Sequence, residues 1–348
     1  MTTDEVVLVT GATGFIGSLL VRKLVAQGAR VRALTRRGPG KAPPGFTDLE
    51  GNASGAGSVE WVAGDILDAD SVIRAAQGCR RIFHLAAYAK NWAPRRETFF
   101  EYNVGGLRNM LDAARRANVE RMVWTSTIVT FGTTRRDEVA DESRPRPPLA
   151  PLTDYEASKV EAEQAAFDAV RDGLPLVIVN PGRVYGPGHL TEGNSLAQLI
   201  DEYDRGKFPI LLNAGVNVGN YVLVDDVVDG HLLAMQHGRI GERYILGGEN
   251  ATLKKFLRTI DQVTGRRHFQ IPIFRPGALA FSYLQLKRAE WFGVYPTITP
   301  GWVRTFLADW GFSSAKAERE LGYRPAGLRD GLERTMRWLD QVRAASKK

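Results

Sequence analysis

The stretch Val6-Val7-Leu8-Val9-Thr10-Gly11-Ala12-Thr13-Gly14-Phe15-Ile16-Gly17 decides the fold of this chain. A short apolar run leads into three glycines at three-residue spacing, and a helical pattern follows from about Phe15 to Gln27. Glycine permits a tight turn at position 11, a close backbone approach to a pyrophosphate at position 14, and close helix–strand packing at position 17. The free N–H groups that begin the helix attract phosphate. The stretch therefore predicts the first turn of a dinucleotide-binding domain.

Short apolar runs and helical patterns alternate over the next 165 or so residues, which is typical of a parallel sheet covered on both faces. The predicted strands are Val6–Thr10, Val31–Thr35, Val59–Ala63, Arg81–Ala87, Arg121–Thr127 and Leu176–Asn180. Further helices are predicted near residues 68–77, 97–117 and 154–172. We expect an α/β fold, a doubly wound Rossmann parallel sheet with a smaller, mostly helical C-terminal substrate domain. Residues 1–182 form the Rossmann domain, to which 220–247 return, and residues 183–219 and 248–348 form the substrate-binding portion.

Three segments interrupt this regular pattern. Residues 38–57 and 133–152 are rich in turn formers or prolines and are predicted to be loops. The apolar, aromatic stretch 278–295 is predicted to be an ordinary packed helix, with a membrane-surface element or a lid over a substrate as the alternatives. In the same region, Thr252 is a plausible cap for a helix over residues 253–264.

Composition excludes several classes of function. The net charge of +7 raises the possibility of nucleic-acid binding, but the basic residues are scattered in short clusters, so we expect a solvated surface and no nucleic-acid partner. A single cysteine, Cys79, allows no disulfide and no thiolate metal site, and no metal is expected. The first residues predict no signal peptide, and no run reaches the roughly 18 apolar residues that span a bilayer. We therefore expect a cytoplasmic location without stable membrane insertion.

The end of the second strand bears on the choice of nicotinamide cofactor. NAD enzymes usually carry Asp or Glu there, to bind the ribose hydroxyls. This chain has Thr35-Arg36-Arg37 instead. Arg36 is suited to pair with a 2′-phosphate, which favours NADP over NAD. The alternative is that both arginines simply face solvent.

The motif Tyr155-Glu156-Ala157-Ser158-Lys159 carries the predicted chemistry. Spacing of four places the phenol and the ammonium one turn apart on the same side of a helix. A nearby ammonium favours the phenolate, so we expect Lys159 to lower the pKa of Tyr155. Tyr155 can then exchange a proton with a carbinol oxygen while hydride moves to or from the nicotinamide, and Lys159 holds the nicotinamide ribose.

The order of these motifs resembles that of the extended short-chain dehydrogenases/reductases, the NAD-dependent epimerase/dehydratase family. The Gly-x-x-Gly-x-x-Gly turn, the Tyr-x-x-x-Lys pair, Asn103–Asn109 and Asn180–Pro187 all match, and the resemblance covers essentially the whole chain. Within the family, residues 238–250 and 312–317 are most similar to dihydroflavonol-reductase-like and hopanoid-associated sugar epimerase-like members.

The resemblance implies roles for individual residues. Thr127 would hold the substrate oxygen, with Ser126 as the alternative; Asn103 would support the site; and Asp65 would meet the adenine amino group, unless it serves only as a loop or helix-cap carboxylate. His84 is expected to be structural. The expected cofactor contacts are Gly11, Thr13, Gly14, Phe15, Ile16, Gly17, Arg36, Asp65, Ile66, Leu85, Ala86, Ala87, Tyr155, Lys159, Pro181 and Val184. The candidate substrate contacts are Tyr88, Asn91, Trp92, Arg183, Tyr185 and Tyr221.

Three functions are weighed on this basis. The favoured one is an NAD(P)-dependent oxidoreductase that acts on a small-molecule substrate, by NADP-linked reduction of a fairly apolar ketone or aldehyde or by the reverse alcohol oxidation. The first alternative is a nucleotide-sugar epimerase or dehydratase with retained NAD, and the second is a non-catalytic module that senses the cofactor. The resemblance also implies a homodimer formed through helices 97–117 and 154–172.

Overall fold

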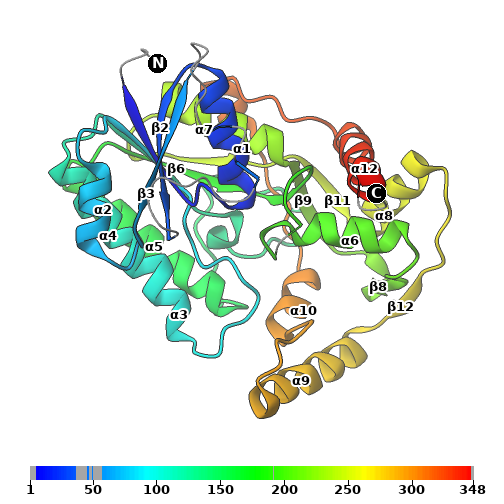
Figure 1. Ribbon diagram of the computed structural model, residues 1–348. Helices are drawn as coiled ribbons and strands as arrows, with labels where there is room; N and C mark the ends of the chain where they lie inside the picture. The colour runs from blue at the N-terminus through cyan, green and yellow to red at the C-terminus, as the bar shows by residue number, and fades with distance from the viewer. Residues whose placement is uncertain (1–4, 37–44, 47–48, 50–56, 191, 346–348) are drawn as a thin grey trace.

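The computed structural model of the protein describes residues 5–36, 45–46, 49, 57–190 and 192–345. A large sheet flanked by helices occupies one side of the molecule, and a smaller, mostly helical part lies on the other (Figure 1). Arg37 and most of the predicted loop 38–57 fall outside the described residues.

The large part is built on a sheet of seven strands, all parallel. In spatial order the strands are β10 (Arg243–Leu246), β6 (Leu176–Pro181), β5 (Arg121–Thr125), β4 (Arg81–His84), β1 (Val6–Thr10), β2 (Arg30–Thr35) and β3 (Ser58–Ala63). Their inner residues are apolar and almost wholly buried, because helices cover both faces. The predicted doubly wound sheet is confirmed, and the order of the strands reverses between β1 and β4.

Each face of the sheet has its own apolar core. On one face α1 (Phe15–Ala26), α7 (Val224–His237) and α11 (Ala315–Leu321) pack on the strands. On the other face lie α2 (Ala69–Ala76), α4 (Gly106–Arg116) and α5 (Asp154–Arg171). A short α3 (Glu97–Phe100) and a π-helical turn, Glu101–Gly105, precede α4. The helices predicted near residues 68–77, 97–117 and 154–172 are therefore all present.

The loop over residues 133–152 has no regular structure, as predicted, but it is fastened to the rest of the protein. Thr134 and Ala140 form isolated bridges with Asp309 and Phe312. The Arg146 guanidinium contacts the Glu156 carboxylate at 2.6 Å, at the start of α5. The loop thus ties the C-terminal region to the helix that carries Tyr155.

The smaller part contains short strands and helices around a separate core. Its strands are β7 (Arg183–Tyr185), β9 (Val218–Leu223) and β11 (Glu249–Thr252) in one sheet, and β8 (Ile210–Leu212) with β12 (Ile271–Ile273) in another. Its helices are α6 (Ser195–Asp204), α8 (Leu253–Thr264), α9 (Arg275–Phe292), α10 (Pro300–Phe306) and α12 (Leu328–Ala345). The Thr252 hydroxyl accepts a hydrogen bond from the Lys255 N–H, which confirms the predicted cap.

The prediction of an ordinary packed helix over residues 278–295 is wrong in one respect. The segment is helical up to Phe292, but within it only Ala278, Ser282 and Ala289 are buried. The large side chains Phe281, Leu284, Trp291 and Phe292 are exposed, since apolar residues occur on more than one side of the helix and only one side meets the protein.

Candidate active site

A cavity of about 330 Å³ opens at the carboxyl ends of the central strands, beside the point where strand order reverses. Ile16 enters it from the turn after β1, Leu85 and Ala87 follow β4, and Pro181 ends β6. Residues 125–127 enter it from the end of β5. Open α/β sheets bind ligands at this place, because loops on either side of the reversal leave a crevice between them.

The glycine turn beside this cavity leaves no room for side chains at two positions. Gly11 has a φ of +69°, and a Cβ there would lie 2.7 Å from the Ala86 nitrogen. A Cβ on Gly17 would lie 2.1 Å from the Gly11 oxygen. A Cβ at Gly14 would lie 3.1 Å from that same oxygen, and no other atom of the described residues would be within 4 Å of it. Within the described part of the chain no side chain caps the amino end of α1, which leaves a backbone cradle suited to a pyrophosphate.

Other expected cofactor contacts follow the ends of β2, β3 and β4, whereas Pro181 and Val184 line the cavity from β6 and β7. Arg36 is exposed directly after β2. The Asp65 carboxylate accepts a hydrogen bond from the Leu67 N–H at 3.0 Å, so the loop role given as its alternative is present. His84 is buried and hydrogen-bonded to the Thr10 hydroxyl at 2.7 Å, and its burial lowers its pKa to about 3.

Thr127, Tyr155 and Lys159 all line the cavity. Tyr155 lies in the first turn of α5, which the Thr153 hydroxyl caps, and it shares the cavity lining with Thr127. The Tyr155 ring is partly exposed to the cavity, but burial of its hydroxyl raises its pKa to about 12, against the lowering effect of Thr127. The direction is opposite to the expected one, because desolvation of the phenolate outweighs the other influences on Tyr155.

Lys159 is buried one turn further along α5. Its ammonium donates a hydrogen bond to the Thr125 carbonyl at 2.9 Å and lies 5.0 Å from the centre of the Trp124 ring. Burial lowers the pKa of Lys159 to about 8, and the Glu163 carboxylate opposes that shift. An ammonium has three N–H donors; with one directed to Thr125, the group can also reach hydroxyls in the cavity.

A buried carboxylate under the site was missed by the sequence analysis. Glu163, one turn beyond Lys159, is only 5% exposed. It accepts hydrogen bonds from Ser126 at 2.6 Å and Thr130 at 2.8 Å, and from Asn180 at 2.7 Å and Arg243 at 3.2 Å. The repeated spacing of four from Tyr155 to Lys159 to Glu163 was the available signal.

The same contacts separate the two candidates for the substrate-orienting hydroxyl. The Ser126 hydroxyl donates to Glu163, beneath the cavity floor. The Thr127 side chain lines the cavity beside Tyr155 and lowers the pKa of the phenol. Of the two, Thr127 is therefore the one oriented towards the phenol.

Asn103 connects the strand end after β4 to α5. Its side-chain oxygen accepts a hydrogen bond from the Tyr88 N–H at 2.8 Å, and its nitrogen donates to the Ser158 hydroxyl at 2.9 Å. It lies within the π-helical turn Glu101–Gly105, a feature that is rare and occurs mainly at functional sites. Asn103 thus fixes α5 next to Lys159.

The candidate substrate contacts divide into two groups. Arg183 lines the cavity, Trp92 lines an adjoining chamber, and Asn91 lines both. Tyr88, Tyr185 and Tyr221 line neither. Tyr185 and Tyr221 are 1% exposed and pack on Phe256 in the core of the smaller part, and the Tyr88 hydroxyl bonds to the Trp92 carbonyl.

Aromatic residues from the C-terminal region form a wall of the cavity that the sequence analysis did not anticipate. Trp302 and Phe306 stack with ring centres 4.1 Å apart, and the Arg183 guanidinium lies 4.3 Å from the Phe306 ring. Trp310 completes this wall. These residues are more than 100 positions from Tyr155 in the chain, so no local pattern links them to it.

A larger chamber of about 960 Å³ shares Asn91, Thr153 and Tyr155 with the cavity. We call it the outer chamber; it lies between the loop before α3, the end of the 133–152 loop, α9 and α10. Its main lining side chains are Trp92, Phe99, Leu152, Leu286, Arg96 and Arg304. Tyr155 therefore borders two adjoining spaces, the inner cavity and the outer chamber.

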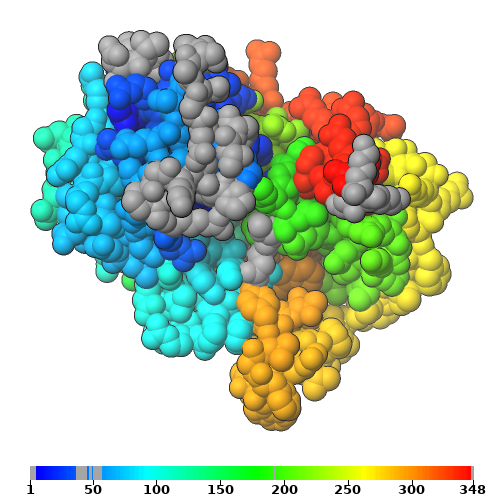
Figure 2. All heavy atoms as spheres, in the orientation of Figure 1, coloured from blue at the N-terminus to red at the C-terminus, as the bar shows by residue number. Residues whose placement is uncertain are grey.

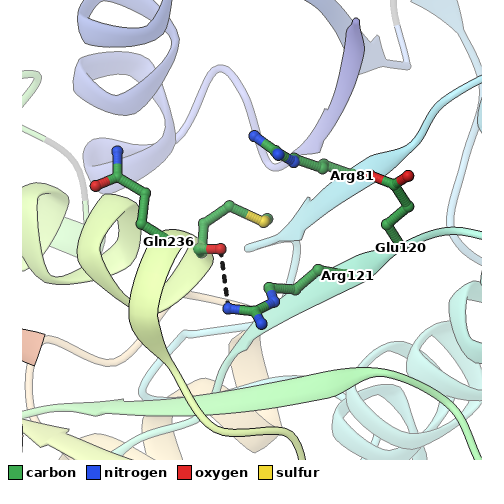
Figure 3. Close-up of a pocket in the computed structure, with 5 residues that line it drawn as sticks. Arg81, Glu120, Arg121 and Gln236 are labelled. Atoms are coloured by element: carbon green, nitrogen blue, oxygen red, sulfur yellow. Dashed lines mark hydrogen bonds between the residues drawn. The ribbon is translucent and has the colours of Figure 1, made fainter. Parts of the chain in front are cut away.

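Another cavity, of about 370 Å³, lies at the opposite edge of the sheet, where β4 and β5 begin. Arg81, Glu120, Arg121 and Gln236 surround it, and Arg121 donates a hydrogen bond to the Met235 carbonyl (Figure 3). It is remote from the glycine turn and from α5's first turns, so we assign it no part in the chemistry.

Comparisons with known proteins agree with this geometry. A family described as "NAD dependent epimerase/dehydratase family" matches residues 7–247. The chain is 34% identical to a putative dihydroflavonol 4-reductase of Synechocystis, over 95% of this chain and 93% of that protein. It is 32% identical to sterol demethylase protein B of Methylococcus capsulatus, over 95% and 97%. The structure of DesIV, a dTDP-glucose 4,6-dehydratase from Streptomyces venezuelae with NAD bound, superposes with a TM-score of 0.76 at 27% identity, over 97% and 98% of the two chains.

Proposed function

The chain belongs to the NAD-dependent epimerase/dehydratase family and is an NAD(P)-dependent oxidoreductase, and from this premise we propose that it reduces a fairly apolar ketone or aldehyde with NADPH, or runs the reverse alcohol oxidation. The observation that carries the proposal is the meeting of Thr127, Tyr155 and Lys159 in one cavity beside the glycine turn. The aromatic wall of Trp302, Phe306 and Trp310 faces the same space.

In this proposal each of the three side chains has a separate task. The bound cofactor supplies or accepts a hydride. Because the pKa of Tyr155 lies near 12, the phenol holds its proton at neutral pH and donates it to the carbonyl oxygen as charge develops there. Thr127 orients that oxygen toward the phenol. The Lys159 ammonium holds the nicotinamide ribose hydroxyls and favours the phenolate that forms.

The preference for NADP rests on the charge at the end of β2. Thr35 ends this strand, Arg36 is exposed immediately after it, and no carboxylate occupies either position. A guanidinium there pairs with a 2′-phosphate, whereas an acidic group would repel it.

The lining of the cavity favours an apolar substrate over a sugar nucleotide. A nucleotide diphosphate needs several cationic or N–H donors that converge on it. Here the Arg183 guanidinium already stacks on Phe306 and donates to the Thr305 carbonyl at 3.1 Å. The names of two relatives, a reductase of a flavonoid and a sterol-processing protein, point to bulky ring systems for those proteins, and we extend that chemical class to this chain.

We propose that two copies associate through α4 and α5. The exposed faces of these helices carry charged residues that include Arg108, Arg115 and Glu161. Light scattering at micromolar concentration checks this proposal, and a monomer there refutes it.

The experiment that tests the proposed function is a titration of cofactor-stripped protein with NADPH and NADH, for the wild type and for Arg36→Ala. We expect tighter binding of NADPH and loss of the difference in the variant. A ketone and aldehyde screen then follows, in which Tyr155→Phe must bind NADPH normally and lose turnover. If NAD(H) binds as well or cannot be stripped, sugar-nucleotide epimerisation replaces this proposal. If no carbonyl compound is turned over, the cofactor-sensing alternative stands instead.

A further inference from the structure

Helix α9 presents an apolar stripe to solvent. Phe281, Leu284, Trp291 and Phe292 are 53%, 66%, 73% and 71% exposed, and Phe274, just before the helix, is 64% exposed. Together they expose on the order of 600 Å² of apolar surface, because a whole aromatic side chain presents about 150–250 Å². A contiguous apolar patch beyond a few hundred Å² marks an interaction site on a protein surface.

The stripe is distinct from the side of α9 that meets the protein. With about 100° of rotation per residue, Phe281, Leu284, Arg288, Trp291 and Phe292 fall within one sector roughly 100° wide. The buried residues Ala278, Ser282 and Ala289 lie in a different sector, as do the chamber-lining residues Tyr283, Leu286 and Glu290. The stripe therefore cannot be the inner face of a lid over the substrate.

The position of α9 leaves this face accessible. The helix lies at one extremity of the molecule (Figure 1), and the segment around residues 275–305 projects as the lowest part of the space-filling view (Figure 2). No helix in the described part of the chain is long and apolar enough to cross a membrane.

The charges on α9 distinguish between possible occupants of the stripe. The helix carries three basic residues, Arg275, Lys287 and Arg288, and one acidic residue, Glu290, which pairs with Lys287 at 2.6 Å. Arg288 lies within the stripe. Contact with the same stripe of a second copy would bury Arg288 without an acidic partner from that stripe, which is costly. Anionic lipid headgroups would instead pair with it while the aromatic side chains enter the acyl boundary.

We propose that the stripe on α9 docks the protein reversibly onto the surface of an anionic lipid bilayer. Exposed Trp, Phe and Leu side chains with a nearby Lys and Arg are the residue types with which helices bind at the surface of an anionic membrane. In this orientation the outer chamber, lined by Tyr283 and Leu286 of the same helix, lies on the side of α9 that faces away from the bilayer.

The test is flotation of the full-length protein with phosphatidylcholine vesicles, with and without phosphatidylglycerol, in the absence of cofactor and substrate. We expect binding to the anionic vesicles. The double variant Phe281→Ser/Trp291→Ser should weaken it about a hundredfold, since burial of each side chain accounts for a factor of about ten or more. Arg288→Gln should weaken binding several-fold, and only with the anionic vesicles.

The matched control is Val139→Ser/Ile240→Ser, which alters two side chains that are 60% and 53% exposed on other parts of the surface and should leave vesicle binding unchanged. NADPH affinity equal to that of the wild type shows that each variant is folded and keeps this readout separate from the reaction. Wild-type protein that does not float with anionic vesicles overturns the proposal. Unchanged flotation of the Phe281→Ser/Trp291→Ser variant also overturns it. So does a wild-type dimer that binds no vesicles and that this double substitution converts to a monomer.

Discussion

Replacing Glu163 by Gln removes one negative charge from beneath the active site while nearly keeping the shape of the side chain. The Glu163 carboxylate raises the pKa of Lys159, which burial otherwise lowers to about 8. An attraction of about 1.4 kcal/mol between two opposite charges raises the pKa of the basic group by one unit. Without Glu163, the pKa of Lys159 should therefore fall by about one further unit.

The sign of the pH effect follows from the proposed role of Lys159. If its ammonium holds the ribose hydroxyls, cofactor affinity is constant below the pKa of Lys159 and falls above it. For the wild type, the dissociation constant of NADPH should begin to rise near pH 8. For Glu163→Gln the rise should begin about one unit lower, since the ammonium loses its proton earlier.

The assay is the dissociation constant of NADPH, measured by its fluorescence across this pH range. Glu161→Gln removes an exposed carboxylate from the same helix and should leave the pH profile unchanged. Glu163→Asp keeps the negative charge, so its pH profile should lie close to that of the wild type. A purely structural role for Glu163 would weaken binding by the same factor at every pH. That result, or a rise at the wild-type pH, would refute the reasoning.

Two further predictions concern binding and stability. Gly17→Ala should reduce NADPH affinity at least tenfold in a titration, because its Cβ would lie 2.1 Å from the Gly11 oxygen and displace the phosphate-binding turn. Gly327→Ala, whose Cβ would meet nothing within 4 Å and whose φ is not positive, is the control for cofactor affinity. Burial lowers the pKa of His231 to about 4, below the unfolded value, so its neutral form contributes stability that is complete above about pH 6.5 and is lost as the pH falls toward 4. Urea unfolding of the wild type should show the free energy of unfolding fall by about 1.4 kcal/mol per pH unit in this range. The fall should be smaller in His231→Gln and unchanged in His237→Gln, the control at an exposed residue. Equal pH dependence in the wild type and His231→Gln would contradict the prediction.

The sequence was sufficient for features that depend on local spacing. The glycine turn, the alternating apolar strands and the four-residue step from Tyr155 to Lys159 are each contained within a few turns of chain, and the structure has the corresponding elements. Sequence spacing could not reveal that desolvation would raise the pKa of Tyr155, since burial is a property of the folded protein.

The tyrosines expected at the substrate show where local reasoning fails. Tyr185 lies in a strand of only three residues, too short for its alternation to reveal which side faces the cavity. It packs on Phe256 in the core of the smaller part, and Tyr221 does the same from β9. The aromatic side chains that do face the cavity come from α10 and the segment after it, and only tertiary folding brings them there.

Successive turns of α5 join the active site to the core of the sheet. Tyr155 borders the cavity, and Lys159, one turn deeper, donates a hydrogen bond to the end of β5. Glu163, one turn beyond that, accepts hydrogen bonds from Thr130, which follows β5, and from Asn180 of β6. Arg243 of β10 completes this cluster and lies 4.2 Å from the Phe131 ring. A substitution at Arg243 would leave a buried carboxylate without its cation. Its effect should therefore reach the Thr127 segment and Lys159, although Arg243 itself does not line the cavity.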